Sequence, residues 1–362
     1  MQKEIFFCLL VSLYFLPVSH HEQTGLSLSN HRDSVENNLF GSDKVLNITL
    51  EGNVRELLND RSGTAIYYPF ILTCKNENDA EASIPINVKT RGHFRREKTN
   101  CFYPPLLLSI PKTDSASVFP TNAKLKLGMP CKGEDFVVYE WLVYKLYNLV
   151  TPQSFRARLV KVNLKDTKNK KMVSPFYGII LEEENQMAAR NNLIVIKKKL
   201  SPQEINLQSF LRMAVFEYFI GNTDWSVEYL QNIKLLARDS ASVPFSVPYD
   251  FDLSGFVNAP YAKPAEELQM NSVRERRYRG YCIKDMKIFD STIAFYNGLK
   301  SAFYKTITDC PFVDSRYKKE TLKYFDEFYA ILDDPSSLKK EFQYPCSKYG
   351  TGNVIIKGLR ED

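Results

Sequence analysis

The chain has 362 residues, of which 44% are hydrophobic and 13% aromatic, so it can bury a large core in one domain or two lobes and is not a largely disordered protein. Its formal charge of +6 arises from 48 basic and 42 acidic residues that are mixed along the sequence, which gives no indication of a nucleic-acid partner.

The first segment of the chain, residues 1–20, has the pattern of a secretory signal peptide. A short polar start at residues 1–4 precedes an apolar run at 5–16, which is too short to span a membrane comfortably. We therefore expect a protein that is secreted, periplasmic or at the cell surface, with no stable membrane span after signal removal. A buried N-terminal helix is the alternative. Residues 21–44 are polar and are expected to form an exposed leader.

Six cysteines remain after removal of the signal segment: Cys74, Cys101, Cys131, Cys282, Cys310 and Cys346. An even number in an exported protein is compatible with three disulfides, but six cysteines allow about fifteen pairings and the sequence does not choose among them. Free buried cysteines are the alternative. None of the six belongs to a Cys-x-x-Cys or Cys/His cluster, so a structural zinc site has little support.

Residues 45–184 read mainly as strands. Alternating apolar residues and intervening turns predict strands at 45–50, 67–73, 84–90, 105–110 and 123–127, one helix between 133 and 152, and a hairpin made of 158–164 and 177–182. Residues 185–362 read mainly as helix, at 208–220 and 290–332. We therefore expect an α+β fold with two lobes, an antiparallel-sheet N-lobe with one helix and a mainly helical C-lobe.

Two polar loops in the second half carry the groups most suited to catalysis. Asp224 follows one apolar segment and Asn232 comes eight residues later, while Asp250 and Asp252 follow the next apolar segment. Carboxylate and amide oxygens that converge from neighbouring loops suit Mg²⁺ bound with nucleotide phosphates. Helix capping and a simple strand-to-turn exit are the alternative interpretations of these loops.

Four short motifs resemble the spore-coat CotH kinase family, an atypical and often exported branch of the protein-kinase-like folds. They are KTRGHFRR at 89–96, YGIILEE at 177–183, FIGNTD at 219–224 and PYDFDLS at 248–254. The resemblance implies a bilobal protein-kinase-like fold that binds ATP and Mg²⁺. It also implies that Asp224 orients the acceptor hydroxyl, that Asn232 and Asp250 bind the metal, and that Asp252 is a second ligand or a turn cap. The chain departs from the family in two ways: the amide usually follows the aspartate by about five residues, and Trp225-Ser226 replaces the usual histidine.

Candidate phosphate-binding residues lie in the first half. Lys124 and Lys126 leave the same face of one predicted strand, so either could reach phosphate oxygens, and Arg91 is a further candidate. By the same resemblance, Glu140 on the predicted helix would pair with the lysine. Residues 182–184 would form the hinge that meets the adenine edge. A solvated strand face and a surface helix residue are the alternatives.

A basic run, Arg274, Arg276, Arg277 and Arg279, could bind an acidic or phosphorylated substrate, and a solvated helix face is the alternative. Together the patterns predict an exported CotH-like kinase that transfers the γ-phosphoryl group of ATP to a hydroxyl of a protein. The alternatives are a catalytically degenerate binding or scaffold protein at the cell surface, and a metal-dependent hydrolase that uses the three aspartates to activate water.

Overall fold

A computed structural model describes residues 39–75, 81–112, 117–169 and 173–348. These residues belong to one compact unit, Asn37–Asp362. The predicted signal peptide and most of the predicted leader lie outside the described residues. At the end of the leader region, Leu39 is buried and belongs to the apolar core of the barrel described below.

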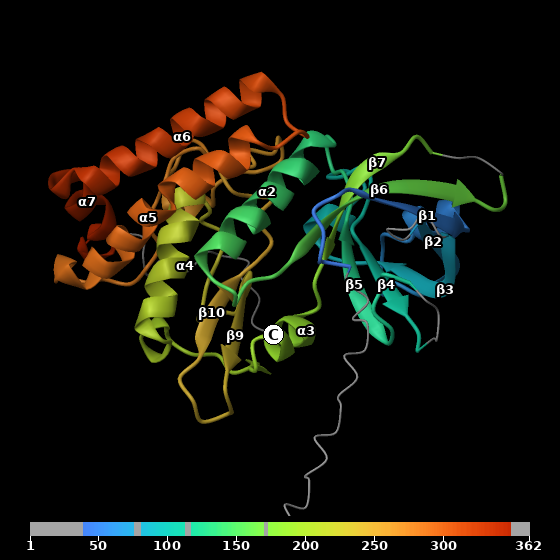
Figure 1. Cartoon of the computed structure of the whole chain (residues 1–362), viewed down its shortest axis with the longest axis horizontal. Helices are drawn as coiled ribbons and strands as arrows, with labels where there is room; N and C mark the ends of the chain where they lie inside the picture. Colours follow the sequence, from blue (N-terminus) through green and yellow to red (C-terminus); the bar gives the residue numbers. More distant parts are fainter. Residues whose placement is uncertain (1–38, 76–80, 113–116, 170–172, 349–362) are drawn as a thin grey trace, which may run out of the picture. The chain divides into compact units, whose positions relative to one another are not determined.

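In the described part of the chain, seven strands close into a barrel (Figure 1). In order around the barrel they are β1 (Leu46–Gly52), β2 (Tyr68–Lys75), β3 (Glu81–Thr90), β4 (Leu106–Ile110), β5 (Ala123–Gly128), β7 (Phe176–Leu181) and β6 (Ala157–Asp166). Neighbouring strands are antiparallel except for β1 and β6, which run parallel and close the barrel, with Leu46 opposite Val160.

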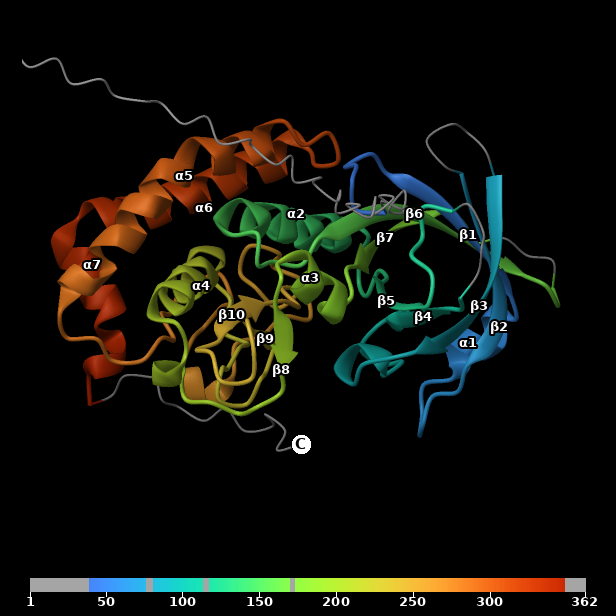
Figure 2. The same cartoon turned by 60° about the horizontal axis from the view of Figure 1, so that its bottom comes forward.

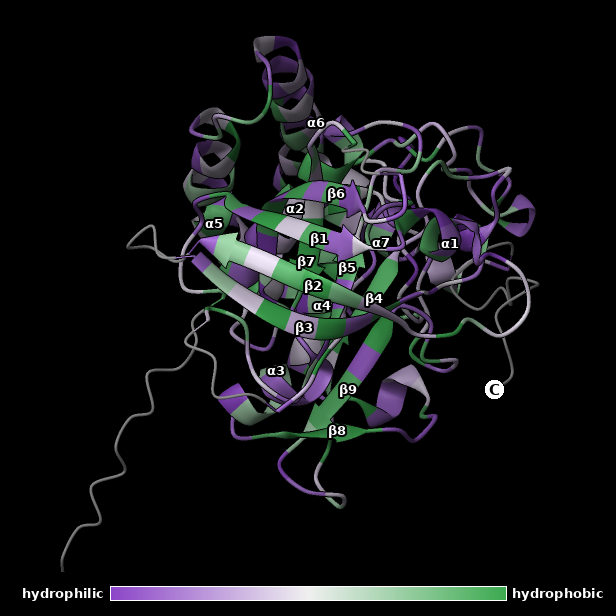
Figure 3. Ribbon diagram, turned by 90° about the vertical axis from the view of Figure 1, so that its right-hand side faces the viewer, coloured by the Kyte–Doolittle hydropathy of each residue, from purple (hydrophilic) through white to green (hydrophobic). Residues whose placement is uncertain are grey.

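The alternation in the sequence explains why these segments form the barrel wall. In β1 the side chains of Leu46, Ile48 and Leu50 are buried and those between them are half-buried or exposed, as the two-residue period of a strand requires. Figure 3 shows the same alternation as bands of apolar and polar residues along the strands. The short helix α1 (Val54–Asn59) packs against β3 and β6. One apolar core therefore fills the barrel.

The predicted fold class is wrong in its description of the first half. We expected a bilobal, protein-kinase-like arrangement with an antiparallel sheet, whereas the strands form a closed barrel that contains a parallel pair, β1 and β6. The segments themselves were predicted at nearly the observed positions, including α2 (Asp135–Val150) and the antiparallel β6–β7 pair. The prediction failed because β1 pairs with a strand more than a hundred residues away in the sequence. No local sequence pattern indicates such a pairing.

Helix α2 connects the barrel to the helical half. Ten of its 16 residues are buried, because it contacts β6 and β7 on one side and α4 (Leu207–Ile220) and α5 (Asp290–Thr308) on the other. Figures 1 and 2 show it between the barrel and the helices. A helix that is apolar on most of its surface is the type expected at such an internal position.

The helical half also contains a small sheet. Its antiparallel strands, in the order β10 (Phe245–Pro248), β9 (Ile233–Ala237) and β8 (Ile194–Ile196), were not predicted. The remaining helices are α3 (Glu184–Arg190), α6 (Ser315–Asp333) and α7 (Pro335–Phe342). Helix α4 packs against β10. The sheet thus places the ends of β9 and β10 next to the loop that follows α4.

Two disulfides cross-link the described part of the chain. Cys101 pairs with Cys131, and Cys282 pairs with Cys346, whereas Cys74 and Cys310 are buried and form no disulfide. The sequence was compatible with three disulfides, and the structure has two in its described residues. Disulfides of this kind are compatible with an oxidising compartment outside the cytoplasm. Within the described ranges, no helix has both the length and the apolar character needed to cross a bilayer.

Candidate active site

The loop that follows α4 positions Asp224. The helix ends at Gly221, whose φ of 68° is in the left-handed region, and a Cβ at this position would lie 2.2 Å from the hydroxyl of Tyr324. Beyond the helix, the side chain of Asn222 accepts a hydrogen bond of 3.1 Å from the backbone N–H of Asp224. Asn222 has almost no exposed surface. The start of this loop is therefore fixed by the left-handed conformation of Gly221 and by the hydrogen bond from Asp224 to the buried Asn222 side chain.

The eight-residue separation between Asp224 and Asn232 is absorbed by a tight turn. Ser226 and Gln231 form an antiparallel bridge, with the backbone N–H of Ser226 donating to the carbonyl of Gln231 at 3.0 Å, and the chain returns beside its starting point. The Asn232 amide then donates to the backbone carbonyl of Asp224 at 2.8 Å and to its carboxylate at 2.9 Å. The unusual spacing therefore still brings the two side chains together.

Asp250 and Asp252 follow β10 in different environments. The backbone N–H of Asp250 donates to the hydroxyl of Tyr144 on α2 at 3.0 Å, and its φ is 65°. Its carboxylate is half-buried and makes no hydrogen bond or ion pair within the described ranges. The Asp252 carboxylate is buried and accepts a hydrogen bond of 2.9 Å from the hydroxyl of Tyr261. Positive φ values at Asn232 and Asp250 are uncommon for residues other than glycine, although Asn and Asp tolerate them best.

A pocket with a cavity volume of about 340 Å³ collects most of the predicted site residues. Those that line it are Arg91, Lys126, Glu140, Asp224, Asn232, Asp250 and Asp252. Lys124 does not line it and is exposed on the barrel surface. A volume of this size is within the range of small-molecule sites. The barrel, helix α2 and the two loops of the helical half all contribute to its wall.

Sequence reasoning assigned no role at the site to Arg95, which lies in the KTRGHFRR motif at 89–96. Its side chain is only 13% exposed, and its Nη1 atom lies 3.8 Å from Oε2 of Glu140 and 3.4 Å from Oδ2 of Asp252. The expected partner of Glu140 was Lys124 or Lys126, whereas its ion pair in the structure is with Arg95. Nothing in the local sequence distinguishes Arg95 from Arg96, whose guanidinium pairs with Asp60 instead.

Lys126 has a different neighbour. Its Nζ atom lies 4.7 Å from the centre of the Tyr249 ring, a cation–π distance. Burial, with a smaller contribution from the nearby positive charge of Arg91, lowers the pKa of Lys126 to about 8. The negative charges of Asp250 and Glu184 offset this effect only in part, so an anionic ligand at this half-buried cation would further stabilise its charged form.

Three carboxyl groups of the pocket titrate above their ordinary range. Burial, together with the negative charge of Asp250, raises the pKa of Asp224 and raises that of Asp252 to about 6. Burial and the nearby Asp252 raise the pKa of Glu140 well above its usual value. Burial lowers the pKa of Arg95, but Tyr261, Asp252, Glu140 and Asp250 outweigh that effect and raise it overall. Burial is the largest cause in each of the three, so a cation bound beside these carboxyl groups would lower their pKa.

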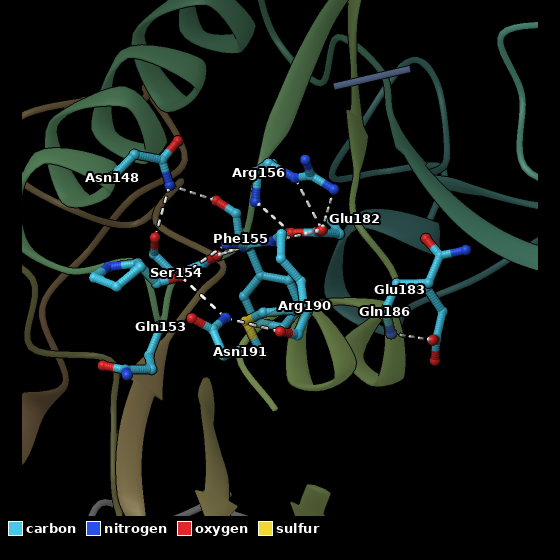
Figure 4. A network of polar contacts seen from close by, with 12 residues as sticks. Asn148, Gln153, Ser154, Phe155, Arg156, Glu182, Glu183, Gln186, Arg190 and Asn191 are labelled. Carbon is cyan, nitrogen blue, oxygen red and sulfur yellow. Dashed lines mark hydrogen bonds and ion pairs between the residues drawn. The ribbon is translucent and has the colours of Figure 1, made fainter. Parts of the chain in front are cut away.

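The junction between β7 and α3 is a buried ionic network (Figure 4). The side chain of Glu182 has no exposed surface, and its carboxylate pairs with Arg156 at 2.7 Å and with Arg190 at 3.0 Å. Glu183 caps α3, and Glu184 pairs with Lys234 at 2.6 Å. The predicted hinge segment thus makes its polar contacts with the protein itself through side chains.

The basic run at 274–279 is not a solvated helix face. Arg274 lies over the ring of Tyr324, Arg276 donates to the carbonyls of Phe219 and Tyr324, and Arg279 donates to the carbonyl of Thr223. The segment is not helical. Arg279 thus supports the loop that carries Asp224, and Arg276 supports the end of the helix before it, a role that neither interpretation of the run anticipated.

The residues at the pocket include no group of three or more His, Cys, Asp or Glu side chains placed to hold an ion, and the same is true of every described residue. Mg²⁺ bound together with phosphates usually takes one or two carboxylates, so it does not require such a group.

No protein-family model matches the chain, and no curated protein matches it. Among solved structures, the chain is similar to a Helicobacter pylori proinflammatory kinase, CtkA, with a TM-score of 0.39 and 13% sequence identity over 64% of this chain and 89% of that chain. A likeness at this TM-score supports no conclusion about fold or activity, and we draw none from it.

Proposed function

We propose that the chain binds ATP with Mg²⁺ in this pocket and transfers the γ-phosphoryl group to a hydroxyl of a protein. The observation that carries the proposal is the carboxylate of Asp250, which faces the pocket beside Asp224 and Asn232 and has no hydrogen bond or ion pair with any described residue. The positive charges of Lys126 and Arg95 act on Asp250 without forming an ion pair with it, so its oxygens stay available to a bound cation.

The donor set fits Mg²⁺. Asp250 supplies a carboxylate, and Asn232 uses its amide N–H groups on Asp224, which leaves its amide oxygen as an acceptor. When bound, Mg²⁺ would neutralise phosphate charge and orient the triphosphate. The positive φ of both residues is consistent with strain retained at a functional site.

Basic and apolar residues of the pocket suit the two ends of a nucleotide. Lys126 and Arg91 would bind phosphate oxygens from the barrel side. Ile179, Leu181 and Tyr249 line the same pocket and offer an apolar surface for a base. The lowered pKa of Lys126 is consistent with a cation that nearby carboxylates balance only in part and that phosphate would balance further.

In the proposed step, the acceptor hydroxyl oxygen forms a bond to the γ-phosphorus, and the bond from that phosphorus to the β,γ-bridging oxygen breaks. ADP leaves with the bridging oxygen, and Asp224 orients the hydroxyl and takes its proton. Burial raises the pKa of Asp224, which makes its carboxylate a better proton acceptor. Positioning and charge stabilisation would supply most of the rate enhancement.

Two further observations support the proposal. The motifs at 89–96, 177–183, 219–224 and 248–254 resemble the CotH kinase family, whose members transfer phosphoryl groups. The two disulfides are compatible with the expected export of the chain, for which we propose the cell surface, the periplasm or the medium. The acceptor would then be a protein of the same compartment.

A labelling experiment tests the proposal and separates its alternatives. The full chain is incubated with Mg²⁺ and ATP labelled at the γ-phosphate, with a mixture of candidate acceptor proteins, and the Asp250→Asn variant serves as the control. Label on protein that disappears in the variant is the expected result. Label released only as free phosphate supports the hydrolase, and no Mg²⁺-dependent ATP binding by wild type supports the degenerate binding protein.

A further inference from the structure

We propose that the guanidinium group of Arg95 takes the place of a second divalent cation beside Asp252, so that the pocket binds one cation, on Asp250 and Asn232. This inference rests on the proposed function and deepens it, because it states how many metal ions the phosphoryl-transfer site uses. It also assigns to Arg95 the role of a positioning residue and removes Asp252 from the metal ligands.

Arg95 occupies the space between two buried carboxylates. Its Nη1 atom is 3.4 Å from Oδ2 of Asp252 and 3.8 Å from Oε2 of Glu140, and the three side chains are 13%, 11% and 10% exposed. The Nη2 atom donates to the backbone carbonyl of Met129 at 2.5 Å. A cation that bridges carboxylates from two separate elements has the same electrostatic role as a bound metal ion.

The two aspartates of the second loop differ in how their oxygens are used. Oδ2 of Asp252 accepts hydrogen bonds from both Tyr261 and Arg95. The carboxylate of Asp250 has no protein partner within the described part of the chain. A divalent ion at Asp252 would have to displace a guanidinium or approach it closely, and the repulsion between two cations opposes that arrangement. A divalent ion therefore meets less repulsion at Asp250 than at Asp252, whose Oδ2 atom already binds a guanidinium.

The chain that follows Arg95 is anchored at two points, which makes the position of Arg95 a fixed feature of the pocket. Next to it, Arg96 pairs with Asp60 at 3.1 Å and donates to the carbonyls of Ser62 and Gly63. Beyond it, the disulfide of Cys101 joins this loop to the segment that leads into α2. Arg95 can thus remain in place when a nucleotide binds.

Counting bound cations tests the inference. Mn²⁺ is titrated into the full chain in the presence of a non-hydrolysable ATP analogue, and free Mn²⁺ is measured by electron paramagnetic resonance. We expect one Mn²⁺ per chain in wild type and in Asp252→Asn. In Arg95→Met, which keeps the length of the side chain without its charge, we expect a second Mn²⁺, whereas Arg95→Lys, which keeps a cation, should bind one.

The other possible Mn²⁺ counts show whether the one-cation inference or the proposed function fails. Two Mn²⁺ in wild type with one in Asp252→Asn, or loss of Mn²⁺ in Asp252→Asn, overturns the inference and leaves the proposed function standing. No Mn²⁺ in wild type overturns the proposed function as well. If Arg95→Met does not fold, as judged by circular dichroism, the comparison of wild type with Asp252→Asn still decides the result.

Discussion

Replacing Lys126 by methionine should make the protein more stable at neutral pH. Burial lowers the pKa of Lys126 from 10.5 to about 8, and this gap corresponds to about 3 kcal/mol of unfavourable free energy for the charged form in the fold. The variant keeps most of the hydrocarbon stem. It loses the cation–π contact with Tyr249, which is worth about 1–2 kcal/mol at a desolvated site. A net gain of about 1–2 kcal/mol in the free energy of unfolding is therefore expected.

The pH dependence of this gain follows from the direction of the pKa change. Below about pH 8 Lys126 is protonated in both the folded and the unfolded state, so the full cost is present in wild type. As the pH rises from about 8 to 10.5 the folded protein loses this proton first, and the cost fades. The advantage of the variant should thus be greatest near pH 7 and should be lost near pH 10.5.

Urea unfolding without reducing agent, followed by circular dichroism at pH 7 and pH 10, measures both effects. Lys124→Met is the matched control, because Lys124 is exposed on the same strand and its replacement should change stability by less than about 0.5 kcal/mol. The reasoning is refuted if Lys126→Met is no more stable than wild type at pH 7, or if its advantage does not fall with pH. Loss of the ATP-induced thermal shift in Lys126→Met alone would in addition support the phosphate-binding role.

Three further substitutions test other parts of the structure. Gly221→Ala should lower the free energy of unfolding in urea by about 2–5 kcal/mol, because φ is positive and the new Cβ meets the Tyr324 hydroxyl. Combination with Tyr324→Phe should recover part of that loss. Full stability of the single variant would contradict the expectation. Glu182→Ala should cost about 2–3 kcal/mol in the same assay, since it removes the shared anion of two partly exposed arginines. The capping-residue variant Glu183→Ala should cost only about 1 kcal/mol, and equal losses would argue against the network. Asp224→Asn should lower labelled phosphoryl transfer by about 10²–10⁴-fold while calorimetry shows unchanged ATP binding, and unchanged transfer would exclude it as the proton acceptor.

Most elements were predictable from the sequence because their signals are local. In β1, the alternation of Leu46, Ile48 and Leu50 with polar residues identifies both the strand and its buried face. The same alternation does not identify the neighbouring strand. Closure of the barrel depends on the pairing of β1 with β6, and alternating residues fit an open sheet and a barrel equally well. The fold class was wrong for this reason.

The pocket was predictable to the extent that polar residues directly follow buried elements. Asp224 comes after α4 and Asp250 after β10, and the structure brings both to one pocket. Arg95 and Tyr261 were missed because each contacts Asp252 only through the tertiary fold, Arg95 across 157 residues of sequence. The roles of these residues in binding and transfer remain predictions for the experiments above.

The junction at Glu182 has a consequence for how a nucleotide would reach the pocket. The carboxylate of Glu182 has no exposed surface and pairs with Arg156, which directly precedes β6, and with Arg190 at the end of α3. It resists bending of the chain between the barrel and the small sheet, because bending would break both ion pairs. We therefore expect entry and exit to depend on side chains at the pocket mouth, without a domain-closing motion. Association should then follow a single kinetic phase whose rate rises linearly with nucleotide concentration.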